Sequence, residues 1–335
     1  MDRRDRKRLL KLEPVSETVY LNRRHFMERI GFSGLAATVS VIPSFSSDLP
    51  KQSFAEPDQM LRPGIERPNV LACFPAPRNE YFNEQPGRVS GFTDEVVAAT
   101  HNNFYEFYPG QAGNIWRLTR RFAPDPWRIQ VKGLCRKPRS FDIDDIYSLF
   151  GAFQEERAYR FRCVEAWAMD VPWTGFEFRK ILEMVEPTSN AKFVRFVTAM
   201  DPNSMKGIDQ AYHYPWPYSE SLRMDEALNP LTLLVTGIYG RPLPRQHGSP
   251  FRIVVPWKYG YKSAKSIRSI ELTEHQPPTF WNTVAPNEYG FLSNIDPNIP
   301  HPRWSQKTER VLGTGDRRPT LLYGGYSNFV APLYS

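Results

Sequence analysis

The sequence predicts a mixed, β-rich α+β fold. Two observations lead to this prediction. Segments whose apolar residues alternate, as in half-buried strands, outnumber segments whose apolar residues recur at helical spacing. The 335 residues also include 31 prolines against 20 glycines, which favours short strands joined by rigid connections over a helical bundle. A hydrophobic fraction of 41% over this length is enough for one large core or two modest ones.

The predicted strands begin at Trp127–Gly133, which alternates and ends at a glycine. The further predicted strands are 159–167, 192–198, 231–236, 251–257 and 266–272. Helices are predicted between them at 140–150, where Ser140 is the expected N-cap, and at 178–186 and 221–227.

The N-terminus has the pattern of a twin-arginine export signal. Arg23 and Arg24 precede a mildly apolar run, Ile30–Ile42, that ends at Pro43. The run is too short for a spanning helix of about twenty residues, and its basic, apolar and Ser/Pro-rich parts follow the order of a signal peptide. The alternative is an amphipathic surface helix. Export through the twin-arginine translocase would place a folded, cofactor-loaded protein in the periplasm.

We therefore divide the chain into three parts. Residues 1–46 are the twin-arginine signal peptide, residues 47–100 an extended N-terminal arm, and residues 101–335 the main domain. The formal net charge is +7. Residues 1–30 hold nine Lys or Arg against five Asp or Glu, so most of that charge is in the leader. The nearly balanced remainder lacks the basic surface of a nucleic-acid-binding protein.

The cysteine pattern excludes several classes of site. Cys73, Cys135 and Cys163 contain no C-x-x-C pair, which excludes a disulfide framework, a Cys₄ zinc site and a c-type haem attachment. The six histidines are scattered singly and give little support to zinc, and Gly313-Thr-Gly315 lacks the third glycine of a dinucleotide loop. Cys73 and Cys135 are either buried thiols or a disulfide pair.

The clearest candidate for chemistry is Cys163, within Arg160–Trp167. On the predicted strand, Phe161 and Glu165 share its face and Arg162 points to the other side. Neighbouring guanidinium groups favour a thiolate, the form that binds soft metals. Glu165 is placed to relay protons to such a metal. The alternative is that Cys163 is a small buried apolar residue.

Two other segments suit an anionic, flat ligand. A strand that begins at Arg252 leads into a turn where the small residues Ser263 and Ala264 let backbone N–H groups approach a phosphate, and Arg252 and Lys265 supply positive charge. Asn102–Phe107 interleaves polar and aromatic side chains, as a loop against a heterocycle would. A solvated basic turn and a packed surface loop are the alternatives.

The segment Arg162–Trp167, followed by Val171–Trp173, resembles the metal-binding cysteine region of the periplasmic, molybdopterin-dependent methionine-sulfoxide reductases. Further stretches resemble that family in the same order, namely Glu186–Lys192, Asp225–Ala227, Pro230–Leu233, Val255–Gly260, Glu288–Phe291 and His301–Ser305. The resemblance runs from about Asn102 to near the C-terminus. It implies the sulfite-oxidase-like fold and a Mo-molybdopterin cofactor with one molybdenum and one pterin.

The resemblance also implies roles for individual residues. Cys163 would be the thiolate ligand of molybdenum, and Glu165 and Tyr289 would act at the substrate. Arg252 and the backbone of Ser263–Lys265, which includes Ala264, would hold the pterin phosphate. The other pterin contacts would come from Asn102, Tyr105, Glu106, Thr198 and His247.

Two positions depart from the family. His247 stands where we expect Asn, and its titration would make the pterin contacts sensitive to pH. Ser263-Ala264 stands where we expect Gly and a larger aliphatic residue, and a backbone contact tolerates this change if φ at Ser263 is negative.

The implied function is the reduction of methionine sulfoxide in exported proteins, a repair of the cell envelope. The sequence has no haem, flavin or Fe–S motif, so electrons would come from a haem-binding membrane subunit of the MsrQ type. The chain ends soon after Arg303-Trp304, which leaves little room for a dimerisation domain, and we expect a monomer apart from that partner. The alternatives are a small S- or N-oxide reductase, a sulfite oxidase, or an exported binding module without metal.

Overall fold

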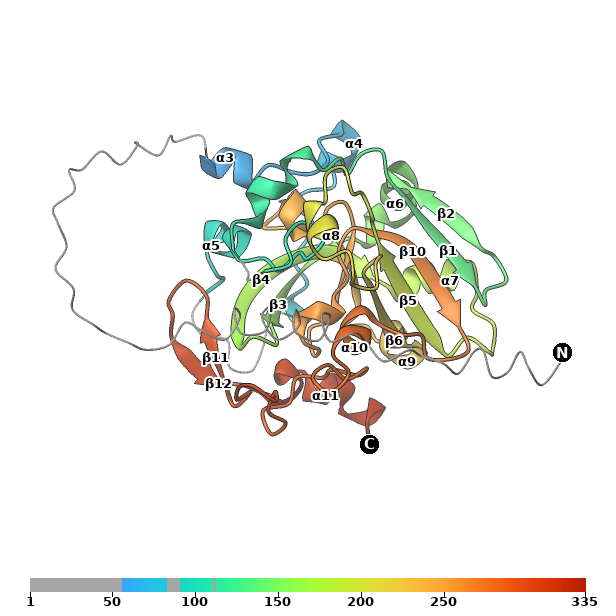
Figure 1. Cartoon of the computed structure of the whole chain (residues 1–335). Helices are drawn as coiled ribbons and strands as arrows, with labels where there is room; N and C mark the ends of the chain where they lie inside the picture. The colour runs from blue at the N-terminus through green and yellow to red at the C-terminus, as the bar shows by residue number, and fades with distance from the viewer. Residues whose placement is uncertain (1–55, 83–90, 111–112) are drawn as a thin grey trace, which may run out of the picture. The chain divides into compact units, whose positions relative to one another are not determined.

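One of the two sheets in this computed structural model has five strands in the order β2-β1-β10-β5-β6 (Figure 1). Their bounds are β1 Arg128–Gly133, β2 Arg139–Asp142, β5 Phe193–Thr198, β6 Ser219–Arg223 and β10 Ile267–Thr273. Neighbouring strands are antiparallel except for the parallel pair β1 and β10. Side chains of β1 and β5 alternate in burial, because one face of the sheet packs on the core. The alternation predicted for these segments is confirmed.

The other sheet has seven strands. Its path is β12-β11-β4-β7-β8, with β3 paired to β4 and β9 paired to β7. Their bounds are β3 Glu155–Arg162, β4 Trp167–Glu177, β7 Leu233–Ile238, β8 Arg241–Pro242, β9 Arg252–Val254, β11 Thr308–Val311 and β12 Arg317–Pro319. Side chains of β3, β4 and β7 are buried almost throughout, so both faces of this part of the sheet are covered.

The strand predicted at 159–167 is wrong in its second half. β3 ends at Arg162, and the chain turns before β4 begins at Trp167. Ala166 has φ of 63°, in the left-handed region that residues other than glycine rarely adopt. No glycine, proline or asparagine marks this turn in the sequence, and the alternation of apolar residues continues through it.

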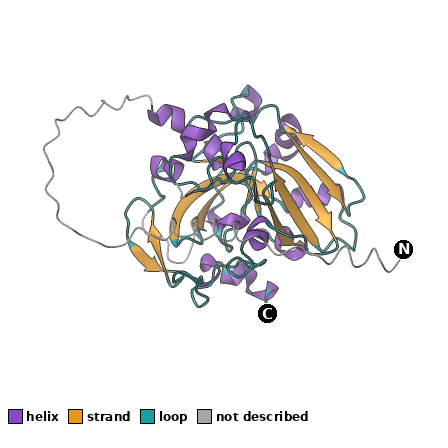
Figure 2. Ribbon diagram, in the orientation of Figure 1, coloured by secondary structure: helices purple, strands orange, loops and turns teal. Residues whose placement is uncertain are grey.

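The helices are short and lie between the strands and over the sheets (Figure 2). Their bounds are α3 Glu56–Met60, α4 Pro68–Leu71, α5 Glu95–Thr100, α6 Ile143–Phe150, α7 Arg179–Val185, α8 Lys206–Gln210, α9 Met224–Leu228, α10 Phe280–Val284 and α11 Ser327–Val330. Short 3₁₀ helices lie at Glu80–Phe82, Ile115–Arg121, Gly151–Phe153, Arg245–His247, Gly260–Lys262, Leu322–Gly325 and Ala331–Leu333.

Two predicted helix starts are wrong by a few residues. Ser140 lies in β2, and the N-cap of α6 is Asp142, which exchanges hydrogen bonds with Asp145 in a capping box. Ser221 lies in β6, and α9 begins only at Met224. In both places a strand runs directly into a helix, so the two periodicities overlap in the sequence. The helix predicted at 178–186 is confirmed as α7.

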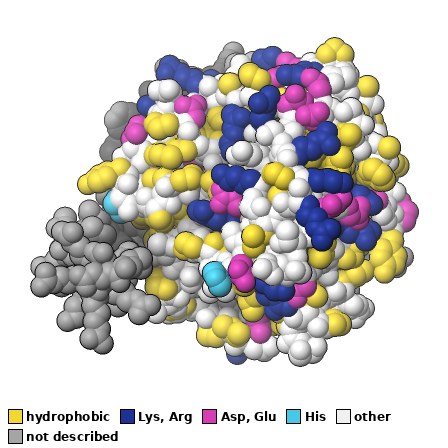
Figure 3. Space-filling view, turned by 90° about the vertical axis from the view of Figure 1, so that its right-hand side faces the viewer, with side chains coloured by type: hydrophobic (Ala, Val, Ile, Leu, Met, Phe, Trp, Pro, Cys, Tyr) yellow, Lys and Arg dark blue, Asp and Glu magenta, His cyan; other side chains and the backbone are white. Residues whose placement is uncertain are grey.

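The structure describes residues 56–82, 91–110 and 113–335, which all belong to the unit spanning 52–335. The predicted signal peptide lies outside the described residues. The described part of the predicted N-terminal arm carries α3, α4 and α5. Among the described residues, no helix has the length and apolar character needed to cross a membrane. The face in Figure 3 shows basic and acidic side chains side by side, as expected of a nearly balanced charge.

Candidate functional site

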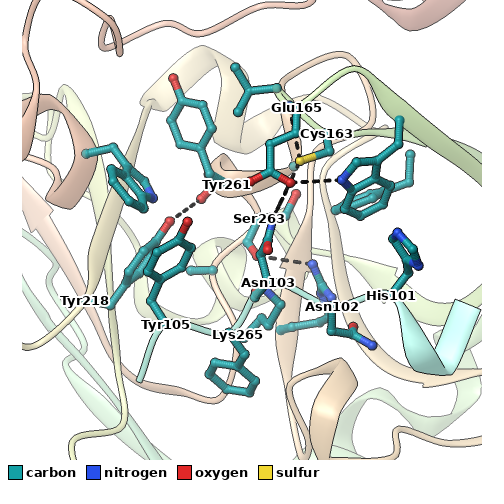
Figure 4. Close-up of a pocket in the computed structure, with 18 of the residues that line it drawn as sticks. His101, Asn102, Asn103, Tyr105, Cys163, Glu165, Tyr218, Tyr261, Ser263 and Lys265 are labelled. Carbon is teal, nitrogen blue, oxygen red and sulfur yellow. Dashed lines mark hydrogen bonds between the residues drawn. The ribbon is translucent and has the colours of Figure 1, made fainter. Parts of the chain in front are cut away.

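A pocket lies where the loop after α5, the β3–β4 turn and the segment after β9 meet (Figure 4). It encloses about 790 Å³, including the space open to solvent. The structure brings ten of the twelve predicted site residues to its wall, namely Asn102, Tyr105, Glu106, Cys163, Glu165, Arg252, Ser263, Ala264, Lys265 and Tyr289. They come from segments up to 187 positions apart in the sequence, from 102 to 289.

The Cys163 thiol is presented by the turn between β3 and β4. The backbone N–H of Cys163 donates to the carbonyl of Trp167 at 2.9 Å, and the N–H of Ala166 donates to the carbonyl of Cys163 at 3.2 Å. These bonds fix a tight turn rather than a continuous strand. The side chain is buried, with 7% exposure, and its sulfur faces the pocket (Figure 4).

A small hydrogen-bonded group surrounds the sulfur. Asn103 Nδ2 lies 3.8 Å from Cys163 Sγ and donates to Glu165 Oε2 at 3.1 Å. Trp167 Nε1 donates to the same carboxylate oxygen at 3.1 Å, and the Glu165 backbone N–H points to the sulfur at 3.5 Å. Glu165 is therefore held beside the thiol. Sequence reasoning missed Asn103, although it lies within the stretch Asn102–Phe107 that was singled out.

The expectation that nearby arginines favour a thiolate at Cys163 is wrong for the protein chain by itself. Burial, and then the neighbouring Glu165 carboxylate, raise the pKa of Cys163 well above its usual range. The Arg162 guanidinium points to the Cys163 carbonyl and to Glu309 instead. A thiolate at this position therefore needs a further positive charge, such as a metal ion, in contact with the sulfur.

A buried ion cluster lies directly behind the Cys163 turn. Glu309 is 1% exposed and accepts from Arg160 Nε at 2.9 Å and Arg318 Nε at 2.7 Å. Arg162 Nε lies 3.0 Å from its other carboxylate oxygen. Arg318 also pairs with Asp170, at 2.9 Å. The cluster joins β3 and β4 to the β11–β12 hairpin and fixes the strand end that carries Cys163.

Two cations face the pocket without a carboxylate partner among the described residues. Arg252 is 1% exposed, and its guanidinium donates to the carbonyls of His247 at 3.0 Å and Ser263 at 3.2 Å. The Lys265 ammonium is half-buried and donates to the carbonyl of Asn103 at 2.8 Å. Burial lowers the pKa of Arg252 to about 9 and that of Lys265 to about 7. An anion bound here would compensate both charges.

The backbone beside these cations is open to an acceptor. Ser263 has φ of −93°, which confirms the condition set for a residue other than glycine at this position. Its N–H already donates to Gly260. In the described part of the chain, the next two N–H groups, those of Ala264 and Lys265, have no hydrogen-bond acceptor. Two consecutive free N–H groups next to a buried and a half-buried cation form an anion-binding cradle.

Thr198 and His247 do not line the pocket. Thr198 lies one layer behind and donates to Glu106 at 2.8 Å, while burial raises the pKa of Glu106. His247 is 1% exposed, and its carbonyl, rather than its ring, contacts Arg252. Burial and the nearby cations lower the pKa of His247 to about 3. The predicted pH sensitivity at His247 is therefore wrong for the neutral range, because the ring stays uncharged.

Aromatic rings form one wall of the pocket. Trp281 packs against Tyr105 with ring centroids 4.8 Å apart and against Tyr289 at 5.0 Å. Tyr261 meets Tyr289 edge to face at 5.3 Å. Sequence reasoning missed Trp281 and Tyr261. Trp281 is a core-facing residue of the short helix α10, and its sequence neighbourhood carries no chemical pattern.

The two other cysteines are free thiols. Cys73 Sγ points to the carbonyl of Asn69 at 3.5 Å, and Cys135 forms an isolated backbone bridge with Pro187. Both are half-buried. The disulfide pair that the sequence left open is not formed, and neither thiol lines the pocket.

Comparisons with known proteins agree with this geometry. Residues 117–281 match the family model described as an oxidoreductase molybdopterin-binding domain. The protein-methionine-sulfoxide reductase catalytic subunit MsrP of Burkholderia mallei is 45% identical over 326 residues, covering 96% of this chain and 92% of that protein. The chain belongs to the MsrP family. The MsrP catalytic subunit of Ralstonia nicotianae is 47% identical over 251 residues, covering 72% of this chain and 74% of that protein.

Membership of the MsrP family confirms the resemblance found in the sequence and the mixed, molybdopterin-binding fold. Among solved structures, the sulfane dehydrogenase SoxCD of Paracoccus pantotrophus is 13% identical with a TM-score of 0.44, covering 84% of this chain and 63% of that chain. The matched domain contains Cys163, Arg252 and Lys265, whereas Asn102–Glu106 and Tyr289 lie outside it.

The pocket of this MsrP-family chain fits a molybdopterin. The cofactor carries a phosphate, which needs cations and N–H donors, and a soft metal, which takes a thiolate. Arg252, Lys265 and the two free N–H groups meet the first need at one side of the pocket. Cys163 meets the second need at another side. The unpartnered Oδ1 of Asn103 is a further acceptor, buried at the pocket wall.

Proposed function

We propose that this chain is the catalytic subunit of a periplasmic methionine-sulfoxide reductase that repairs oxidised exported proteins. One observation carries the proposal. A buried thiol, Cys163, shares an open pocket with two cations, Arg252 and Lys265, that form no direct ion pair with a carboxylate among the described residues and donate to backbone carbonyls instead. Two such cations, one buried and one half-buried, are costly unless an anionic ligand occupies the pocket, and the thiol beside them is a suitable ligand for a soft metal carried by that anion. The names of its relatives identify them as methionine-sulfoxide reductase subunits.

The cofactor of this proposal is Mo-molybdopterin, with one molybdenum and one pterin. Cys163 would be the protein ligand of molybdenum. Arg252, Lys265 and the N–H groups at Ala264 and Lys265 would hold the phosphate. The pterin would lie against Asn102, Tyr105 and Glu106, with Thr198 and His247 supporting these contacts from behind. When bound, the cofactor supplies two-electron oxygen-atom transfer.

The surrounding residues supply positions for substrate and protons. Reduction of a sulfoxide to a thioether and water consumes two electrons and two protons. Glu165 is held by Asn103 and Trp167 beside Cys163, at the place where protons are needed. The aromatic wall at Tyr289 and Trp281 gives an apolar surface for the sulfoxide side chain. The relatives are named as catalytic subunits, which implies a partner subunit, and we propose that this partner is a haem-binding membrane subunit that supplies the electrons.

The activity is tested with an unfolded polypeptide that contains methionine sulfoxide, using reduced viologen as electron source. Mass spectrometry should show the loss of one oxygen atom per methionine sulfoxide. Cys163→Ser should abolish this loss, whereas the matched variant Cys135→Ser should retain it. Oxidation of sulfite in the presence of an electron acceptor, without any sulfoxide reduction, would contradict the proposal and favour a sulfite oxidase.

The location is tested separately. We propose that residues 1–46 direct export by the twin-arginine route, which requires both Arg23 and Arg24. Replacing both with Lys preserves the charge but should retain the protein in the cytoplasm. Cell fractionation that finds the Lys variant in the periplasm in normal amounts would refute this route.

A further inference from the structure

A second cleft lies next to the candidate active site. It encloses about 980 Å³, including the space open to solvent. Val164 and Tyr261 line both this cleft and the Cys163 pocket, so the two share a wall one residue from the thiol. The rest of the cleft comes from the irregular segment between α10 and β11 and from Tyr323 and Tyr334 near the C-terminus.

One ring nitrogen in this cleft, Nε2 of His301, lacks a hydrogen-bond partner among the described residues. His301 is almost fully buried, with 2% of its side chain exposed, and its Nδ1 accepts from the backbone N–H of Arg303 at 3.3 Å. A neutral ring with Nδ1 as acceptor carries its proton on Nε2. That Nε2 makes no hydrogen bond with the described residues, and the nearest carboxylate oxygen, Glu288 Oε2, lies 3.4 Å away. Burial lowers the pKa of His301 to about 4, so the ring is neutral at physiological pH.

The position of the His301 ring is fixed from both sides. The ring stacks on Trp304, with centroids 3.8 Å apart and planes 9° from parallel. Trp304 in turn donates from Nε1 to the carbonyl of Val164 at 2.8 Å. On its other side, His301 meets Tyr289 at 5.6 Å. The His301 ring therefore contacts, through Trp304, the turn that carries Cys163, and through Tyr289, the aromatic wall of the pocket.

The charged residues of the cleft differ from those of the pocket. The pocket presents two cations, Arg252 and Lys265, beside the carboxylates Glu106 and Glu165. The cleft is lined by the carboxylates of Glu288 and Asp296, and no Lys or Arg among the described residues lines it. Glu288 is paired with Arg303 at 2.7 Å. Asp296 accepts from the backbone N–H of Asn298 and has no cationic partner among the described residues.

Apolar side chains rim the same cleft. Ile299 is 67% exposed and Leu292 is 38% exposed, and both line it. Isolated exposed apolar residues are common, but two of them beside an unpaired donor and an unpaired carboxylate suit an extended peptide. Such a peptide offers backbone carbonyls as acceptors and side chains on alternate sides.

We propose that this cleft binds the polypeptide segment that flanks the methionine sulfoxide, with a preference for a basic residue near the oxidised methionine. The inference rests on the proposed function. His301 Nε2 would donate to a backbone carbonyl of the substrate, and Asp296 would attract a Lys or Arg side chain. The shared wall at Val164 and Tyr261 would let the sulfoxide reach the pocket while its backbone stays in the cleft.

The test compares three peptides of equal length, each with one methionine sulfoxide flanked by Lys, Ala or Glu. Dimethyl sulfoxide serves as a small substrate that occupies the pocket alone, and reduced viologen supplies electrons to the cofactor-loaded enzyme. The Lys peptide should have a KM about three- to fivefold lower than the Glu peptide, which is the range of one solvent-exposed ion pair. Added salt should narrow this difference.

Two variants locate the effect in the cleft. Asp296→Asn should remove the difference between the Lys and Glu peptides. His301→Phe keeps a flat ring on Trp304 but removes the donor, and it should raise the ratio of peptide KM to dimethyl sulfoxide KM by roughly tenfold. The matched control Asp316→Asn alters an exposed carboxylate in the β11–β12 turn and should change neither ratio.

The outcomes separate this inference from the proposed function. Equal KM values for the three peptides, together with an unchanged KM ratio in His301→Phe, would overturn the cleft assignment and leave the reductase activity standing. An enzyme loaded with molybdenum that reduces neither the peptides nor dimethyl sulfoxide would overturn both.

Discussion

The buried cluster around Glu309 makes a quantitative prediction about stability. Glu309→Gln keeps the size of the side chain but removes the charge that faces Arg160, Arg162 and Arg318. Arg318 retains Asp170 at 2.9 Å, and Arg162 retains Gln306 at 2.7 Å. Breaking a buried ion pair by removing one partner typically costs about 3–5 kcal/mol. We expect a loss of this size in the free energy of unfolding.

The assay is thermal unfolding followed by calorimetry. For a domain of this size, each kcal/mol shifts Tm by roughly 2–4 °C, so Glu309→Gln should lower Tm by on the order of 10 °C. The matched control is Glu183→Gln, which removes a partly exposed pair with Lys180 worth about 0–1 kcal/mol. A Tm for Glu309→Gln within the range of that control would refute the account of the cluster.

The cluster also predicts a change in cofactor content. Arg162 donates to the carbonyl of Cys163, so loss of Glu309 loosens the turn that presents the thiol. Glu309→Gln should therefore purify with less molybdenum than the control variant. If Glu309→Gln is strongly destabilised but keeps its full molybdenum content, the cluster stabilises β3 without positioning Cys163, and this prediction is refuted.

Three further predictions concern the pocket. Arg252→Met should lower the amount of pterin retained on purification by about tenfold or more, since a hydrogen bond to a charged group contributes about 1.5–3 kcal/mol. The control Arg268→Met lies outside the pocket and should retain the pterin. Equal pterin retention in the two variants would contradict the phosphate assignment. The free energy of unfolding of cofactor-free protein should rise with pH between about 7 and 8.5, because burial lowers the folded pKa of Lys265 to about 7, well below the unfolded value of about 10.4, and the unfolded chain then binds more protons. Above about pH 8.5 the raised pKa of the buried Cys163 thiol acts in the opposite direction. Chemical denaturation at a series of pH values measures this, and a flat or falling curve over the lower of these two ranges would refute it. Tyr289→Phe should raise KM for methionine sulfoxide without lowering molybdenum content; a loss of metal would show that Tyr289 supports the cofactor instead.

Much of the sheet structure could be predicted from the sequence, because alternation in burial leaves a clear trace. Trp127–Gly133 and Lys192–Thr198 each have one face on the core, and both are strands within one residue of the predicted bounds. The predicted boundaries between strands and helices were wrong where one element runs directly into the next. Ser140 and Ser221 are good N-cap residues by type, but each lies in a strand that precedes a helix.

The turn at Cys163 could not be predicted, because it depends on an unusual backbone angle at a residue whose type does not indicate a turn. Ala166 adopts a positive φ of 63° that its residue type does not favour. Its carbonyl accepts from the backbone N–H of Arg310 in β11, and its own N–H donates to the carbonyl of Cys163 within the turn. The missed site residues have a similar cause. Trp281 reaches the pocket through the packing of distant segments, which no local pattern encodes, whereas Asn103 lies in the predicted loop Asn102–Phe107 and only its contact with Cys163 could not be foreseen.

The expected lowering of the Cys163 pKa by nearby arginines was wrong, because burial of the thiol has a larger effect on that pKa than the neighbouring charges. The sequence places two arginines beside Cys163, but Arg160 and Arg162 are both directed to Glu309, 149 and 147 positions later along the chain. Burial therefore decides the pKa of the thiol. Arg252 and Lys265 lie at the same pocket, as expected for two residues joined by a short turn, whereas their predicted binding of a phosphate stays a prediction.

The central claim is that Cys163 and the two unpaired cations form a molybdopterin site. The most direct measurement is the molybdenum and pterin content of protein purified from cells supplied with molybdate, by mass spectrometry and by pterin fluorescence after oxidation. The account predicts one molybdenum and one pterin per chain, with the metal lost in Cys163→Ala and retained in Cys135→Ala. Well-folded protein that contains neither metal nor pterin, or Cys163→Ala protein that retains both, would contradict it.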